Sequence, residues 1–357
     1  MFLSHIACKV PQFQVLQDNI KERMIRYFPQ KKGLLQRFYD RSGVHRRHSV
    51  LVEHAQGHAQ ESSLFYLPDR LGNPSTAVRA ALYREHASKL FVATAQAVLQ
   101  QVDPTLVTHV ITVSCTGSYA PGPECDVVRE LRLRPDVQRL HVGFMGCSAV
   151  FPALSMARQI CQADQQAVVL IVAVELCTLH LQPDSSTGSL LGACLFADGA
   201  AGCLVSSRTP LSDNGLKFTN HSFMLPDDAD KITWNIRDEG FYMHLDPQLP
   251  LLVQNNLPMV LDKLLLQRGW QAESVKWAVH PGGPKILDAV QQAQQLPPHM
   301  LDDSREILRL FGNMSSTTIL FVLQRILQNE TKQKNQPIVA LAFGPGVSID
   351  VMLMERS

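Results

Sequence analysis

The chain contains the same order of apolar strand, glycine loop and helix twice, and this repeat constrains its fold more than any other feature. Residues 110–117 form an apolar run that enters a glycine loop, and residues 275–283 repeat that plan at an offset of 165 (280 − 115 = 165). Cys147 and Asn313 each open a segment with helical spacing, at an offset of 166 (313 − 147 = 166). The two offsets agree within one residue, which indicates two similar half-domains.

Continuous apolar runs at residues 168–174 and 337–343 predict strands that are buried on both faces. Helices must then cover both faces of each sheet, so the fold class is layered α/β. In such a duplicated unit Cys147 and Asn313 would be symmetry mates whose helix starts point at one site. His280 ends the strand equivalent to the one that ends at Cys115, so we expect it at the same end of the sheets.

The polar stretch 206–215 is the natural border between the halves. We therefore predict an N-terminal half over residues 1–210 that carries Cys147. The C-terminal half, residues 211–357, carries His280 and Asn313. No segment with the composition of an interdomain linker separates the two halves, so they should form one compact unit.

Cys147 lies in a glycine-flanked segment between an apolar run and a helical pattern, which is typical of a thiol nucleophile. A helix N-terminus offers free N–H groups and a partial positive charge, and both favour thiolate over thiol. The alternative for any cysteine is a small buried hydrophobic residue. That interpretation suits most of the seven others, which are Cys8, Cys115, Cys125, Cys161, Cys177, Cys194 and Cys203.

Composition limits the possible partners. The 357 residues are 45% hydrophobic and 18% charged, with a formal net charge of +1, so no charged field favours nucleic acid. No secretory signal pattern opens the chain and no apolar run reaches about 18 residues, the length of a membrane span. We expect a cytoplasmic protein. Eight cysteines without CxxC pairs fit reduced thiols better than disulfides or a zinc site.

Four motifs occur in a fixed order: GFMGCS (143–148), HPGGPKIL (280–287), GNMSS (312–316) and FGPG (343–346). Through them nearly the whole chain resembles type III polyketide synthases, the chalcone-synthase-like branch of the thiolase superfamily. The resemblance implies a duplicated, layered αβαβα fold. It also implies that Cys147 is the acyl-accepting nucleophile, completed by His280 and Asn313.

The chemistry of a Claisen condensation calls for the same residue types. A cysteine can hold the acyl group as a thioester, and a nearby imidazole can stabilise the thiolate as an ion pair. His280 and Asn313 together would form an oxyanion hole for the enolate of decarboxylated malonyl-CoA, where one donor is worth about 3 kcal/mol. No metal or bound cofactor is expected, because CoA thioesters are the substrates. Taken singly, a histidine that caps a backbone group and an asparagine N-cap are the alternatives.

The resemblance also indicates residues that shape the substrate cavity. Phe196 corresponds to a gate between the CoA tunnel and the cavity, and Met243 stands where plant enzymes have a second gating phenylalanine. Trp234 replaces a glycine, and His180 replaces a small hydroxyl residue connected with cyclisation. Further cavity positions are Thr116, Cys177, Ser315 and Pro345. Ordinary core packing is the alternative for Trp234, Met243 and Cys177.

These replacements favour the bacterial-type branch, which makes alkylpyrones, alkylresorcinols, phloroglucinols or a tetrahydroxynaphthalene, over chalcone formation. Arg46 and Arg47 lie where the family binds CoA phosphates, and Lys285 is a second candidate; a solvated basic face is the alternative. Residues 120–122 match a segment that enters the partner subunit's cavity, so a homodimer is expected.

Related condensing enzymes remain alternatives, because ketoacyl synthase III and hydroxymethylglutaryl-CoA synthase share the nucleophile and the duplicated fold. The motifs HPGGP and GNMSS favour the polyketide branch. A papain-like hydrolase uses the same three residue types but lacks the repeat. An inactive CoA-binding scaffold would not need all three catalytic residues. The starter acyl group, the number of malonyl extensions and the ring closure stay open.

Overall fold

The computed structural model describes residues 1–56, 63–207, 211, 215–329 and 336–356. The predicted border between residues 210 and 211 lies in a stretch of which residues 208–210 and 212–214 are outside the described residues. Among the described residues, no helix has the length and apolar character needed to cross a membrane.

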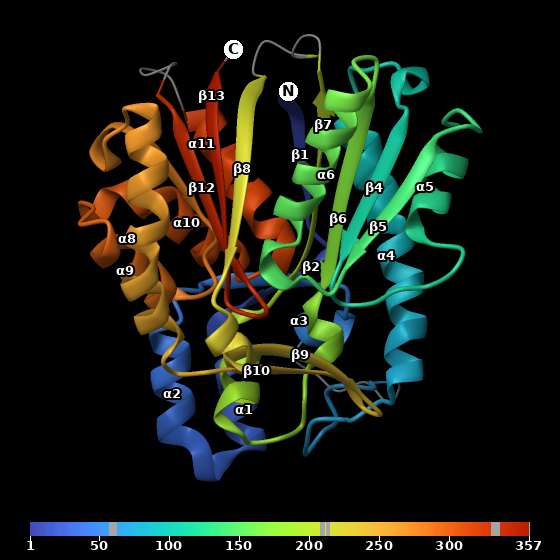
Figure 1. Cartoon of the computed structure of the whole chain (residues 1–357). Helices are drawn as coiled ribbons and strands as arrows, with labels where there is room; N and C mark the ends of the chain where they lie inside the picture. The colour runs from blue at the N-terminus through green and yellow to red at the C-terminus, as the bar shows by residue number, and fades with distance from the viewer. Residues whose placement is uncertain (57–62, 208–210, 212–214, 330–335, 357) are drawn as a thin grey trace.

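A nine-stranded sheet, in the order β11-β12-β13-β8-β1-β7-β6-β4-β5, runs through both halves (Figure 1). The N-terminal half contributes β1 (Phe2–Lys9), β4 (His109–Ser114), β5 (Gln138–Gly143), β6 (Val168–Leu176) and β7 (Asp198–Ser206). The C-terminal half contributes β8 (Leu216–Met224), β11 (Lys276–Val279), β12 (Ile338–Gly344) and β13 (Ser348–Arg356). β4 runs parallel to β5 and β6, and β11 runs parallel to β12. Among the described residues, the pairs Phe2↔Lys217 and Leu3↔Leu216 join the halves between β1 and β8.

Three clusters of buried apolar side chains show the layers. The middle cluster contains residues of α6 (Val150–Ala163) and α11 (Thr318–Asn329), which pack between the two halves of the sheet. The outer cluster of the N-terminal half joins α4 (Thr76–Val98) to β6, and that of the C-terminal half joins α8 (Leu249–Arg268) and α9 (Pro284–Ala293) to β11 and β12. This arrangement confirms the predicted αβαβα fold.

Strand β6 illustrates why the sequence takes this form. All nine of its residues are buried. Ile171 and its alternate neighbours face the middle layer, whereas Leu170 and Val172 face α4. Each fully buried aliphatic side chain contributes about 1.5–3 kcal/mol, so a strand covered on both faces is expected to be predominantly apolar.

The remaining helices lie below the sheet and on both sides of it in Figure 1. They are α1 (Gln17–Tyr27), α2 (Lys32–Asp40), α3 (Val52–Gln56), α5 (Pro123–Glu130), α7 (Thr187–Leu195) and α10 (Asp302–Phe311). Two short antiparallel two-stranded sheets, β2 (Phe13–Leu16) with β3 (Arg46–Ser49) and β9 (Ile232–Arg237) with β10 (Gly240–Leu245), lie outside the main sheet. In Figure 1, β9 and β10 extend beneath it.

The repeat is visible at the starts of α6 and α11. Each helix is preceded by a single 3₁₀ turn, Gly146–Ser148 before α6 and Ser315–Thr317 before α11. Both turns are entered through left-handed backbone, with φ of 65° at Gly146 and 72° at Gly312. The predicted location of Cys147 at a helix start is confirmed.

Both the positive φ at position 146 and the close approach of Pro345 require a glycine there. A Cβ atom at this position would lie 2.2 Å from Cδ of Pro345, a distance that real contacts do not reach. Gly146→Ala should therefore lower the free energy of unfolding by at least about 1–3 kcal/mol, the usual cost of a strained backbone. Chemical denaturation measures this change.

Gly33 in α2 is the matched control, because a Cβ there would meet nothing within 4 Å. Gly33→Ala should be neutral or stabilise by up to about 1 kcal/mol, since alanine favours a helix. Equal unfolding midpoints for Gly146→Ala and the unchanged protein would contradict the argument.

Candidate active site

Cys147 lies in the 3₁₀ turn between β5 and α6 and is half-buried. Burial raises the pKa of its thiol to about 11; hydrogen bonding with Ser315 and with Asn313 acts in the opposite direction, and the charge of Glu175 adds to the increase. The thiol is therefore in contact with the start of α11, as the symmetry of the repeat predicts. Taken alone, this environment keeps the thiol protonated at neutral pH.

Asn313 joins elements from both halves. Its backbone N–H donates to the carbonyl of Leu195 at 2.8 Å, and its own carbonyl accepts from the N–H of Ala197 at 2.9 Å. Its side-chain Oδ1 accepts from the Ser315 N–H at 2.8 Å, and Nδ2 donates to the carbonyl of Gly282 at 3.3 Å. These bonds fix the orientation of the amide, so that the N–H₂ group is the one available beside Cys147.

His280 follows β11 and is 1% exposed. Its backbone N–H donates to the carbonyl of Leu341 at 2.8 Å, which anchors the residue to β12. Neither ring nitrogen has a hydrogen-bond partner among the described residues. Burial lowers the pKa of the imidazole to about 3. Buried polar groups are nearly always paired, so an imidazole with two free nitrogens indicates a place for an incoming polar group.

Glu175 is a component of the site that was not identified from the sequence. It lies near the end of β6, fully buried, and accepts hydrogen bonds from the Cys115 N–H, Thr116 Oγ1 and Ser316 Oγ. Burial raises the pKa of its carboxyl to about 7, against the effect of these bonds. Its signal in the sequence is a single acidic residue in an otherwise apolar nine-residue strand.

Cys115 connects this carboxylate to the nucleophile turn. Its Sγ accepts from the Gly146 N–H at 3.1 Å, directly before Cys147. Its carbonyl accepts from Nε1 of Trp234 at 2.7 Å, and the next carbonyl, that of Thr116, lies 2.7 Å from Nε2 of His180. The structure thus brings three predicted cavity residues, Thr116, Trp234 and His180, to one loop beside the thiol.

The other predicted cavity positions surround the same region. Phe196 is half-buried and forms an isolated bridge with Asn313. Met243 on β10 pairs with Trp234 on β9. Cys177 is half-buried in the turn that ends at His180, and Pro345 packs against Gly146.

The three basic residues predicted to bind CoA have different environments. Arg47 is 1% exposed and donates to the carbonyls of Ala193 and Phe196 at 2.8 and 2.7 Å, so it satisfies the C-terminal end of α7. A buried guanidinium with this role cannot reach phosphates in solvent, so we correct its assignment to a structural one. Arg46 is half-buried, and Lys285 is exposed in the first turn of α9.

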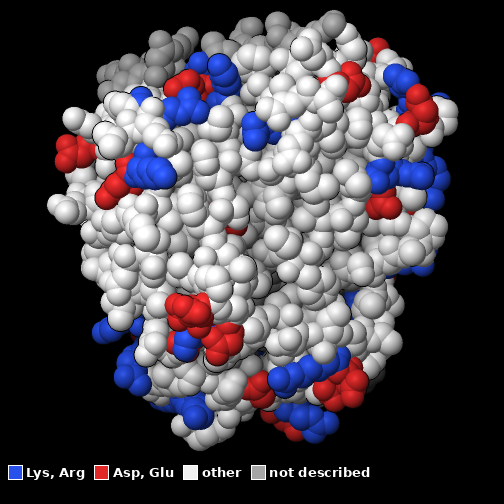
Figure 2. Space-filling model, viewed as in Figure 1, with Lys and Arg blue, Asp and Glu red and all other residues white. Residues whose placement is uncertain are grey.

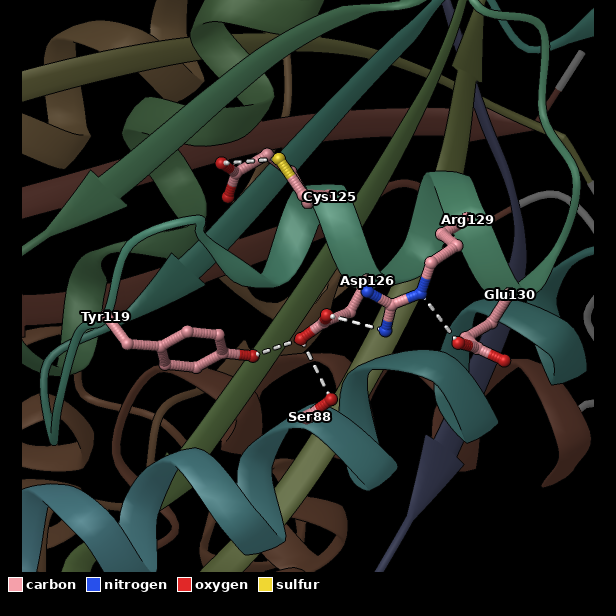
Figure 3. A network of polar contacts seen from close by, with 7 residues as sticks. Ser88, Tyr119, Cys125, Asp126, Arg129 and Glu130 are labelled. Carbon is pink, nitrogen blue, oxygen red and sulfur yellow. Dashed lines mark hydrogen bonds and ion pairs between the residues drawn. The ribbon is translucent and has the colours of Figure 1, made fainter.

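A polar network joins the loop between β4 and α5 to α4 and α5 (Figure 3). Oδ2 of Asp126 accepts from Tyr119 Oη at 2.7 Å and from Ser88 Oγ at 2.8 Å, and Arg129 pairs with Oδ1 at 3.1 Å. Ala120 follows Tyr119 and is exposed. The network therefore fixes the segment that was expected to enter a partner subunit.

A thiol at a helix start, with a buried imidazole and an oriented amide from the other half of an αβαβα fold, defines the class of thiolase-fold, acyl-transferring condensing enzymes. Family models described as the N-terminal and C-terminal domains of chalcone and stilbene synthases match residues 3–209 and 216–357. The chain belongs to this family, the type III polyketide synthases.

Individual relatives agree with this assignment. The chain is 30% identical to a putative chalcone synthase of Bacillus subtilis over 99% of its own length and 98% of that protein. It is 29% identical to 1,3,6,8-tetrahydroxynaphthalene synthase of Streptomyces griseus, covering 90% of this chain and 83% of the relative.

Solved structures show the same likeness. The crystal structure of PKS-I from the brown alga Ectocarpus siliculosus superposes with a TM-score of 0.93 and 26% identity, over 100% of this chain and 99% of that one. Tetrahydroxynaphthalene synthase from Streptomyces coelicolor superposes with a TM-score of 0.90 and 27% identity, also over 100% and 99%.

Proposed function

We propose that this chain loads an acyl-CoA starter onto Cys147, extends it with decarboxylated malonyl-CoA and cyclises the product to a pyrone, resorcinol or phloroglucinol-type compound. The observation that supports this most is the buried His280 imidazole, whose two ring nitrogens have no hydrogen-bond partner among the described residues. The ring lies next to Gly282, whose carbonyl accepts from the Asn313 amide. No metal and no bound cofactor take part in the proposed reaction.

In the loading step the Cys147 sulfur attacks the starter thioester. A carbon–sulfur bond to Cys147 forms, and the bond to CoA breaks. His280 takes the thiol proton and returns it to the departing CoA sulfur. Burial disfavours each charge when it stands alone, but a thiolate and an imidazolium formed together offset one another at short range.

In the extension step malonyl-CoA loses carbon dioxide and leaves an enolate. The N–H donors of His280 and Asn313 stabilise the enolate oxygen. The enolate carbon then attacks the thioester carbonyl, so that the carbon–sulfur bond to Cys147 breaks and the lengthened chain remains on CoA. Arg46 and Lys285, which are not fully buried, are the proposed contacts for CoA phosphates.

The thiolate–imidazolium pair can be tested by alkylation of Cys147 with iodoacetamide, because only the thiolate reacts. In the unchanged protein the rate should vary little between pH 6 and 9. In His280→Ala the thiol loses its partner and keeps a pKa near the value of about 11 that burial imposes. Its rate at pH 7 should fall at least 100-fold and then rise about tenfold per pH unit.

Cys147→Ala is the control that identifies the labelled residue by mass spectrometry. A tenfold increase per pH unit already in the unchanged protein would show that no ion pair exists. The proton would then leave the thiol only during attack.

The overall reaction can be tested by a product screen. Malonyl-CoA is offered with starters from acetyl-CoA to long-chain acyl-CoA, and products are identified by mass spectrometry. Pyrone or phenolic products should form and should be absent with Cys147→Ala. Acylation of Cys147 without any polyketide product would contradict the proposal and indicate another condensing or acyl-transfer reaction.

We also propose that the functional unit is a homodimer. β5 is an edge strand of the sheet, and its residues 138–141 are exposed. Figure 2 shows that the middle of the face over α6 and β8 carries almost no charged side chains. Large apolar side chains that are 37–59% exposed occur on β5, on β8 and between β5 and the turn that carries Cys147: Leu140, Phe144, Met145, Phe223 and Met224. A second copy would pair the edge strand and cover these residues.

Met224→Lys should weaken the dimer at least 100-fold, because a charge would be buried in the apolar centre of the interface. Sedimentation or light scattering over a dilution series measures the dissociation constant. Met259→Lys is the matched control, since Met259 is 72% exposed on α8, in the outer layer. Equal dissociation constants for the two variants, or a monomeric unchanged protein, would contradict the proposed interface.

A further inference from the structure

The hairpin β9–β10 is amphipathic and is separate from the main sheet. Met243 pairs with Trp234 and Phe241 pairs with Ile236, so these four side chains share one face. His244 lies on the opposite face and is exposed. A two-stranded hairpin is at best marginally stable alone, so its position depends on the contacts that it makes with the rest of the chain.

His180 provides two of these contacts through its two ring nitrogens. Nε2 lies 2.7 Å from the carbonyl of Thr116, and Nδ1 accepts from the N–H of Phe241 at 3.1 Å. The first bond reaches the loop beside the nucleophile, and the second reaches β10. A neutral imidazole protonated on Nε2 satisfies both bonds at once.

The rings around His180 pack in a defined geometry. Phe241 stacks on His180 with centroids 4.2 Å apart and planes 13° apart. Trp234 meets both rings edge-on, at 5.5 and 5.7 Å. Nε1 of Trp234 donates to the carbonyl of Cys115. Trp234 and His180 therefore bond to consecutive carbonyls of the same loop.

The turn that carries His180 is itself held rigidly. Arg79, which is 1% exposed, donates through Nη1 to the carbonyls of Leu179 and Leu181 at 2.6 and 3.0 Å. Gln182 continues the contact to the hairpin, with Nε2 3.3 Å from the carbonyl of Glu239 and 3.4 Å from that of Phe241. His180 is thus the central link between a fixed turn, the nucleophile loop and the hairpin.

We propose that His180 is a positioning residue that fastens the β9–β10 hairpin over the site and thereby sets the largest acyl group that Cys147 can extend. This inference rests on the proposed function, because Trp234 and Met243 would line the space beside the growing chain. The imidazole neither donates a proton to the substrate nor contacts it. Burial lowers its pKa to about 3, so it stays neutral throughout the physiological range and keeps one donor and one acceptor.

The test compares His180→Ala with His180→Gln. Glutamine can donate through Nε2 to Thr116 and accept through Oε1 from Phe241, whereas alanine can do neither. Hydrogen exchange at the amides of residues 238–242 reports the hairpin directly and requires no activity. Exchange should be at least tenfold faster in His180→Ala and within threefold of the unchanged protein in His180→Gln.

The second readout is the ratio of kcat/KM for dodecanoyl-CoA to that for acetyl-CoA, with product masses. The ratio should rise at least tenfold in His180→Ala and return to within threefold of the original value in His180→Gln. His244→Ala, on the exposed face of the same hairpin, should change neither readout. If His180→Ala does not fold, Trp234→Phe, which removes the donor to Cys115 together with one ring of the indole, should still speed exchange.

Unchanged exchange in His180→Ala would overturn the proposal, as would a glutamine variant that behaves like alanine. Faster exchange with an unchanged starter ratio would show that the hairpin does not limit acyl size. If the unchanged protein makes no polyketide from any starter, the proposed function fails. In that case the exchange measurement still decides whether His180 holds the hairpin.

Discussion

Every polar group of Asn313 forms a hydrogen bond, and together these bonds connect the two halves of the molecule. Its backbone bonds to residues on either side of Phe196 in the N-terminal half, and its amide bonds to Ser315 and to the loop after His280 in the C-terminal half. The thiol of Cys147 contacts the same amide. Asn313, which is 1% exposed, therefore sets the positions of Cys147, His280 and Phe196 relative to one another.

Desolvation is the main electrostatic effect at this junction. It raises the pKa of Cys147 to about 11 and of Glu175 to about 7, and it lowers the pKa of His280 to about 3. All three shifts disfavour the charged form of the group. Charge can form there only as a pair of opposite charges, or on a substrate oxygen that accepts hydrogen bonds from His280 and Asn313. Such a site suits a reaction in which negative charge moves between a sulfur and an enolate oxygen.

Much of the fold could be predicted from sequence because it follows from periodicity. The continuous apolar runs required strands covered on both faces, and equal offsets required two similar halves. The locations of Cys147 and Asn313 at matching helix starts follow from those offsets. The same argument could not separate Arg47 from Arg46, since the burial of one and not the other depends on the C-terminal end of α7, far away in the chain.

The functions of Glu175 and His180 were beyond the sequence for a related reason. Glu175 bonds to Ser316, and His180 bonds to Thr116 and Phe241. None of these partners is close in sequence to the residue that it bonds. An acidic residue in an apolar strand marks a special position but does not identify the donors that satisfy it. A histidine at a cavity position suggests contact with substrate, whereas both of its nitrogens are already bonded to backbone groups.

The central place of β1 in the sheet has a consequence for synthesis of the chain. Phe2–Lys9 pairs with residues 200–206 on one side and with residues 216–217 on the other. During synthesis β1 thus waits for about two hundred residues before it gains either neighbour. Until then its backbone groups are unpaired on both sides, a condition that favours association with other chains. The N-terminal half can close once β7 has emerged, and β1 then presents a ready edge on which β8 begins the second half.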